Sequence, residues 1–133
     1  MTRQVIQTSK GAPPLGAYSQ GWRAGDLVYV TGTGPIGRDG TVVGGTVAEQ
    51  TDVVINNIEA ILEAAGASLK DVIKANVYLA DATTFPEFNA VYARRFSQPY
   101  PARTTVGVDM RQVPGMRVEI EVVAYVGESD QKL

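Results

Sequence analysis

One arginine and one glutamate stand out as residues that could do chemistry in this chain. Arg103 lies in the segment 101–105, and Glu119 follows sixteen residues later in the segment 117–121. The chain of 133 residues contains no histidine and no cysteine. Serine–histidine and cysteine–histidine nucleophiles, thiolate chemistry and typical zinc sites each need one of those two residues. Any reaction must therefore use arginine, carboxylate, hydroxyl, amide and backbone groups.

Both residues lie in segments that predict strands, 103–108 and 117–126. In the second segment, alternation predicts one face that points to the helices and one that points away. The inward set is Val118, Ile120, Val122 and Ala124, and the outward set is Glu119, Glu121, Val123 and Tyr125.

Four further strands are expected at residues 5–6, 22–24, 27–31 and 72–79. Gly25-Asp26 predicts a tight hairpin turn, and Thr31-Gly32 begins the segment that ends the third strand. The strand 72–79 has two different faces, one with Lys74, Asn76 and Tyr78 and the other with Ile73, Ala75, Val77 and Leu79.

Two helices are expected between these strands. A capping box of Thr46 and Glu49 precedes a periodic apolar segment and predicts a helix over 47–65, which Gly66 ends. Thr84 and Glu87 predict a second capping box, followed by a helix with Phe85, Phe88, Val91, Tyr92 and Phe96. The resulting fold class is α+β, and two helices can cover only one face of the sheet.

The uncovered face decides how the chain assembles. We expect Lys74, Tyr78, Arg103 and Thr105 there, together with the outward residues of the last strand. Such a face is either solvated or buried against another subunit. We favour burial in a cyclic homo-oligomer with clefts between its subunits.

Length and composition predict one domain over residues 1–127 and a flexible tail over 128–133. Twelve basic and fourteen acidic residues give a net charge of −2 without a basic block, which argues against nucleic acid and anionic membranes as partners. No apolar stretch has the length of a membrane span or the pattern of a signal peptide. The lack of cysteine suits a reducing compartment, and we expect a cytoplasmic location.

Several short motifs together resemble the reactive intermediate deaminase (Rid, YjgF-type) family. They are residues 16–20 (GAYSQ), Thr31-Gly32 followed by Pro35, residues 89–92 (NAVY), residues 101–103 (PAR) and residues 118–121 (VEIE). The resemblance implies a chorismate-mutase-like fold, a homotrimer and active sites in the clefts between subunits. It also implies hydrolysis of 2-imino or 2-enamino acids to 2-keto acids and ammonia, without a metal or another cofactor.

The resemblance assigns catalytic roles to Arg103 and Glu119. Arg103 would bind the substrate carboxylate, for which its planar fork suits better than a lysine ammonium. Glu119 would orient and deprotonate the attacking water. Glu121 lies on the same strand face, and a solvated or interface-paired carboxylate is the alternative for Glu119. The family pattern favours Glu119 as the working carboxylate.

The resemblance also implies five substrate-binding residues. They are Tyr18, Thr31, Gly32, Asn89 and Thr105. Tyr18 would reach in from a neighbouring subunit, or else anchor the proline-rich loop; Asn89 would line the cleft, or else be a surface amide. Thr31 and Gly32 would line the pocket or form an ordinary turn, and we expect Thr105 to have a pocket-lining and backbone hydrogen-bonding role.

The chain departs from the common family pattern at Thr33-Gly34, where relatives often have Gln-Ile. We expect the missing apolar side chain at Gly34 to widen or reshape the pocket. Two other functions stay open: a regulatory trimer that binds a small ligand without turnover, and an endoribonuclease. The second would need phosphate contacts and acid–base groups that an acidic chain without histidine offers poorly.

Overall fold

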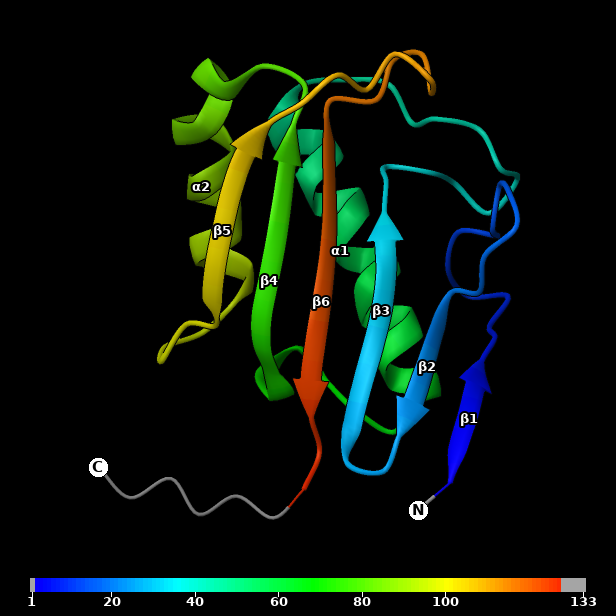
Figure 1. The fold of residues 1–133 in the computed structure, drawn as a ribbon. Coiled ribbons are helices and arrows are strands. Elements are labelled where there is room, and N and C mark those ends of the chain that lie inside the picture. Colours follow the sequence, from blue (N-terminus) through cyan, green and yellow to red (C-terminus); the bar gives the residue numbers. More distant parts are fainter. Residues whose placement is uncertain (1, 128–133) are drawn as a thin grey trace.

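The computed structural model describes residues 2–127 and shows a six-stranded sheet with two helices on one face (Figure 1). The strands are β1 (Arg3–Ile6), β2 (Gly21–Ala24), β3 (Leu27–Thr33), β4 (Val72–Leu79), β5 (Ala102–Gly107) and β6 (Val118–Tyr125). The helices are α1 (Val47–Ala64) and α2 (Phe85–Arg95), with 3-10 turns at Leu69–Asp71 and Ala82–Thr84. The predicted α+β class is confirmed. The predicted tail, 128–133, lies outside the described residues.

The sheet has the strand order β1-β2-β3-β6-β4-β5. Every neighbouring pair is antiparallel except β4 and β5, which are parallel. A parallel pair needs a crossover connection, and α2 supplies it. β5 is therefore an edge strand that lies beside α2 (Figure 1).

Helix α1 begins at the predicted capping box. The Glu49 N–H donates to the Thr46 hydroxyl over 3.1 Å, and the Thr46 N–H donates to the Glu49 carboxylate over 2.9 Å. Gly66, at φ +81°, follows the end of the helix in a conformation that favours glycine. Both predicted ends of this helix are confirmed to within a residue.

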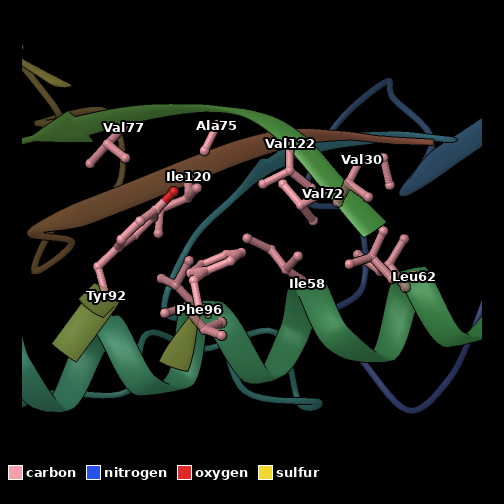
Figure 2. Close-up of a cluster of buried hydrophobic side chains, with 14 of the residues drawn as sticks. Val30, Ile58, Leu62, Val72, Ala75, Val77, Tyr92, Phe96, Ile120 and Val122 are labelled. Carbon is pink, nitrogen blue, oxygen red and sulfur yellow. The ribbon is translucent and has the colours of Figure 1, made fainter. Parts of the chain in front are cut away.

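The core lies between α1, α2 and one face of the sheet (Figure 2). Ile58 and Leu62 of α1 point at the sheet, where Val122 of β6 meets them. Val118, Ile120, Val122 and Ala124 are all buried, which confirms the inward set predicted for β6. No helix of residues 2–127 covers the other face of the sheet, and Trp22, Tyr29 and Tyr125 are each more than 40% exposed there.

Three local predictions are wrong. β3 continues through Gly32 to Thr33, because an irregularity in its pairing with β6 carries the strand past the glycine. Ile73 is exposed rather than inward, since the β4–β6 register shifts between Val72 and Lys74 and Val72 takes the buried place.

The third error concerns the start of α2, where Thr84 and Glu87 form no capping box. The Thr84 hydroxyl donates to the Asp81 carbonyl instead, over 2.6 Å. The Glu87 carboxylate accepts from the Ala48 N–H, over 3.0 Å, and so caps α1. Glu87 thereby links the two helices at their N-terminal ends.

Candidate active site

Arg103 lies on β5 and faces α2. Its Nη1 donates to Oδ1 of Asn89 over 2.8 Å. Its guanidinium carbon lies 4.6 Å from the ring centre of Tyr92, 5.3 Å from that of Phe85 and 5.7 Å from that of Phe88. The guanidinium thus rests on aromatic faces, an arrangement that favours a cation.

These contacts follow from the periodicity of α2. Phe85, Phe88, Asn89 and Tyr92 recur at spacings of three and four residues, which places them on one face of the helix. The rings of Phe88 and Tyr92 lie 5.6 Å apart, and those of Tyr92 and Phe96 lie 4.4 Å apart. The result is a packed aromatic surface against which Arg103 is held half-buried.

The face predicted for Arg103 and Thr105 is therefore wrong. In the parallel register Arg103 lies beside Ala75 and Thr105 beside Val77, and both partners are buried under the helices. Ala102, Thr104 and Val106 occupy the open face instead. Lys74 and Tyr78 do lie on the open face, as expected, and the Lys74 ammonium donates to the Thr104 hydroxyl over 3.1 Å.

Two hydroxyl groups near Arg103 are buried without a hydrogen-bond partner among residues 2–127. They belong to Thr105 and Tyr92. Figure 2 shows the Tyr92 side chain extending from α2 toward the sheet. Burial raises the pKa of Tyr92 to about 12, so its hydroxyl stays protonated at neutral pH.

Glu119 lies on the open face, in a separate hollow of about 580 Å³. Four of the predicted site residues line it, namely Tyr18, Thr31, Gly32 and Glu119. A Cβ at position 32 would lie 3.1 Å from a carboxylate oxygen of Glu119, so glycine lets the backbone approach that carboxylate. Leu15, Ile36, Val113 and Met116 form an apolar part of the wall, and Gln112 adds a polar side chain.

Tyr18 is exposed and held by the loop that precedes it. The Leu15 N–H donates to the Tyr18 hydroxyl over 2.9 Å, and the Tyr18 N–H donates to the Gly16 carbonyl over 2.9 Å. This turn presents the ring at the rim of the hollow rather than in the core.

The two carboxylates of β6 have different surroundings. The Tyr78 hydroxyl donates to Glu121, and that hydrogen bond raises the pKa of Tyr78. Glu119 accepts no such bond among residues 2–127. Burial, followed by the negative charge of Glu121, raises the pKa of Glu119 above its ordinary value. Glu119 is thus the carboxylate of this pair that lines the hollow.

Buried amide side chains on α1 fix the loops around the hollow, and the sequence analysis missed them. Gln50 donates to the carbonyls of Val43 and Gly115 and accepts from the Arg117 N–H. Asn57 donates to the carbonyls of Gly34 and Ile36 and accepts from the Ala12 N–H. Gln20, which precedes β2, has a similar role. It accepts from the Thr8 N–H and donates to the carbonyls of Thr8 and Ala12. The signal was present, because Gln50 and Asn57 interrupt the apolar stripe of α1 seven residues apart.

The predicted site residues therefore lie in two separate groups. The Arg103 half comprises Arg103, Asn89 and Thr105 between β5 and α2, and the Glu119 half comprises Glu119, Thr31, Gly32 and Tyr18 on the open face. Arg103 and Glu119 lie on opposite faces of the sheet, so a single copy does not bring them together.

Comparison with known proteins identifies the family. The profile of the family described as Endoribonuclease L-PSP matches residues 9–126. A RutC family protein of Pyrococcus abyssi is 44% identical over 127 residues, covering 94% of this chain and 98% of the relative. The 2-iminobutanoate/2-iminopropanoate deaminase of Dermatophagoides farinae is 35% identical over 126 residues, covering 93% and 97%. The chain belongs to the Rid family.

The fold is that of solved Rid-family structures. TdcF of E. coli, solved with bound serine, superposes with a TM-score of 0.84 at 30% identity, covering 93% of this chain and 99% of TdcF. In residues 2–127 of this Rid chain, neither helix is long and apolar enough to cross a membrane. Across the same residues, no group of three carboxylates is placed to hold a metal ion.

Proposed function

We propose that this protein hydrolyses reactive 2-imino and 2-enamino acids to 2-keto acids and ammonia, at sites completed between neighbouring copies. The observation that carries the proposal is that residues 2–127 hold a half-buried cation and a half-buried carboxylate, neither of which has an oppositely charged partner there. Arg103 is a half-buried cation with no carboxylate at ion-pair distance among residues 2–127, and Glu119 is a half-buried carboxylate with a raised pKa.

Arg103 has the properties of a carboxylate clamp. Asn89 engages Nη1, and the aromatic rings hold the guanidinium plane, so the side chain is oriented before a substrate arrives. The remaining N–H groups can donate two parallel hydrogen bonds to a carboxylate. A 2-imino acid carries its carboxylate next to the reacting carbon, and this clamp would therefore position that carbon.

Glu119 has the properties of the general base. Water adds to the C=N carbon through its oxygen, and Glu119 accepts the water proton. Glu119 then returns that proton to the nitrogen, which gives a carbinolamine. In a second transfer Glu119 accepts the hydroxyl proton of the carbinolamine and delivers it to the amino nitrogen, so that the C–N bond breaks and ammonia leaves as the C=O bond forms. A raised pKa suits both steps, because the same carboxyl group must accept and then release a proton.

Completion of the site requires a second copy, and we propose the homotrimer expected for the family. Trp22, Tyr29 and Tyr125 are exposed on the same open face of the sheet as Glu119, and these side chains are suited to burial between subunits. The Glu119 half of one copy would then face the Arg103 half of the next. Tyr18 would close over the substrate, and Thr31, Gly32 and Thr105 would line the pocket.

The relatives support this chemistry. One carries the name of a 2-iminobutanoate/2-iminopropanoate deaminase, and TdcF was solved with serine, an α-amino acid with the carboxylate that Arg103 would bind. The bound serine also favours the alternative of a ligand-binding regulatory trimer. In that case Arg103 would be needed and Glu119 would not. A cytoplasmic location remains a prediction.

Glu119→Gln separates the enzyme from the binding module. Glutamine keeps the shape but cannot take a proton, so kcat on 2-iminobutanoate should fall by about 10²- to 10⁴-fold while a 2-keto acid still binds. Glu121→Gln is the matched control, because Glu121 is engaged by Tyr78 and does not line the hollow. Full activity of Glu119→Gln, with loss of activity in Glu121→Gln, would show that the other carboxylate is the base.

A second measurement tests the assembly. Light scattering should give the mass of a trimer of the 14.2 kDa chain at micromolar concentration. A monomer would contradict the proposal, since one copy leaves Arg103 and Glu119 on opposite faces.

A further inference from the structure

The space beside Gly34 is filled by the thioether of Met116. A Cβ at position 34 would lie 2.7 Å from Sδ of Met116 and 3.5 Å from Cγ1 of Ile36. Gly34 is buried, and its φ is not positive, so the backbone itself does not require glycine. The missing side chain therefore reshapes the hollow rather than widening it, because Met116 occupies the room that glycine leaves.

The backbone on both sides of this contact is fixed. Asn57 donates to the Gly34 carbonyl over 3.2 Å, which holds the strand end. Gln50 donates to the Gly115 carbonyl over 2.9 Å and accepts from the Arg117 N–H over 2.8 Å, on either side of Met116. The part of this wall that can adjust is consequently the methionine side chain and not the loop that carries it.

Met116 lines two hollows. They are the 580 Å³ hollow of Glu119 and a second hollow of about 710 Å³ along the 107–116 connection, and Val113 also lines both. A methionine side chain has three rotatable bonds and a polarisable sulfur, so it adapts to its neighbours more readily than a β-branched residue. Since Met116 lines both hollows, its thioether can shift into either one without a change in the backbone.

We propose that Met116 is the specificity-determining residue of this site, an adjustable wall that sets how large a substrate side chain is accepted. The inference rests on the proposed function. In the proposed site, Arg103 of a second copy holds the substrate carboxylate and Glu119 faces the reacting carbon. The apolar part of the hollow wall, which includes Leu15, Ile36 and Met116, is then left for the substrate side chain. Gly34 and Met116 then act together, because the lack of a side chain at position 34 leaves the space that the thioether of Met116 fills.

Two substitutions should move the specificity in opposite directions. The readout is the ratio of kcat/KM for the imine generated from leucine to kcat/KM for the imine generated from 2-aminobutyrate. Met116→Ala enlarges the hollow and should raise this ratio by about tenfold, the effect of roughly one methylene in an apolar pocket. Gly34→Ala adds a methyl group to the wall and displaces the thioether, and it should lower the ratio by about tenfold.

Met110→Ala is the matched control, because Met110 is an equally buried methionine of the same connection that lines only the second hollow. It should leave the ratio unchanged. If Met116→Ala does not fold, Met116→Ile keeps the volume while stiffening the wall, and it should lower the ratio.

The outcomes are distinct for the two proposals. If the wild-type protein accelerates hydrolysis of neither imine, the deaminase function is refuted. The role of Met116 is then tested separately, by the ratio of the dissociation constants of the two corresponding 2-keto acids. Active wild type with the same ratio in folded Met116→Ala and Gly34→Ala overturns the role of Met116. An equal change in Met110→Ala overturns it as well, because the effect would then belong to the connection as a whole.

Discussion

The two halves of the candidate site are held in different ways. Hydrogen bonds fix the Glu119 half, where Asn57 and Gln50 of α1 bind the loops around the hollow. Packing fixes the Arg103 half, where three aromatic rings of α2 support the guanidinium and Asn89 supplies one hydrogen bond.

This difference follows from the elements that carry each half. Loops have unpaired backbone groups, and burying them requires partners, which the amides supply. Arg103 lies on β5, whose backbone is already hydrogen-bonded to β4, so packing against the aromatic rings of α2 is enough to hold its side chain. The Glu119 half should therefore be sensitive to the loss of a polar group, and the Arg103 half to the loss of a ring.

The largest expected effect tests whether the halves belong to different copies. Arg103→Ala and Glu119→Gln should each abolish most activity when assembled alone. When the two variants are co-expressed, some interfaces combine the intact Glu119 half of an Arg103→Ala copy with the intact Arg103 half of a Glu119→Gln copy. Only these interfaces should be active. Random assembly should restore about a quarter of the wild-type activity, measured on 2-iminobutanoate with purified mixed oligomers.

The control is a mixture of the two variants purified separately and not allowed to exchange subunits, which should stay inactive. No recovery in verified mixed oligomers would mean that the halves do not cooperate across a subunit interface.

The next effect concerns stability in the Glu119 half. Asn57→Leu leaves the Gly34 and Ile36 carbonyls and the Ala12 N–H without their partner, at a cost of about 3 kcal/mol or more. Urea unfolding at matched protein concentration measures the change. Asn56→Leu is the control, since Asn56 is exposed and makes one surface hydrogen bond, from Arg95 over 2.8 Å, so its loss should change the free energy of unfolding by about 1 kcal/mol or less. Equal losses in both variants would contradict a special role for Asn57.

Much of the fold was predictable because local chemistry determined it. The Thr46–Glu49 capping box, Gly66 and the apolar stripe of α1 agree with one another, so the helix was placed to within a residue. The alternation of β6 gave the correct face for Glu119, because apolar residues at every second position can point only to the core. The resemblance to the Rid family named Tyr18, Thr31, Gly32 and Glu119, and all four line the hollow.

The Arg103 half was harder because its face depends on tertiary contacts. Residues 102–107 carry no clear apolar side, and only the parallel register with β4 shows that Arg103 points to α2. The failed capping box at Thr84 has a similar cause. Its residue types and spacing were suitable, but Asp81 and Ala48 compete for the two side chains in space.

A smaller effect sharpens the electrostatic side of the comparison. Since burial and the Glu121 charge raise the pKa of Glu119, activity should fall as the pH drops through that raised pKa. Glu121→Gln removes the second cause, so the acidic limb of kcat/KM should move to lower pH. Glutamine can still accept the Tyr78 hydrogen bond, which keeps the geometry. An acidic limb that does not move would exclude Glu119 as the titrating base.

The same raised pKa fixes the sign of a stability effect. A carboxyl group whose pKa is higher in the folded state favours folding below its unfolded pKa and loses that contribution as the pH rises through the folded value. At neutral pH the charged Glu119 is therefore unfavourable for folding. Glu119→Gln should unfold at the same or a higher temperature than wild type at pH 7, and this advantage should vanish at acidic pH.

The smallest expected effect lies in the Arg103 half, at Tyr92. Its hydroxyl is buried without a partner among residues 2–127, while its ring stacks on Phe96 and supports Arg103. Tyr92→Phe removes the hydroxyl and keeps the ring, so the free energy of unfolding should stay the same or rise by up to about 1 kcal/mol, with kcat/KM nearly unchanged. Tyr92→Leu, which removes the ring, should lower kcat/KM because Arg103 loses its closest support. A loss of stability in Tyr92→Phe comparable to that in Asn57→Leu would mean that the hydroxyl has a partner in solution, and that hydrogen bonds fix the Arg103 half as they fix the Glu119 half.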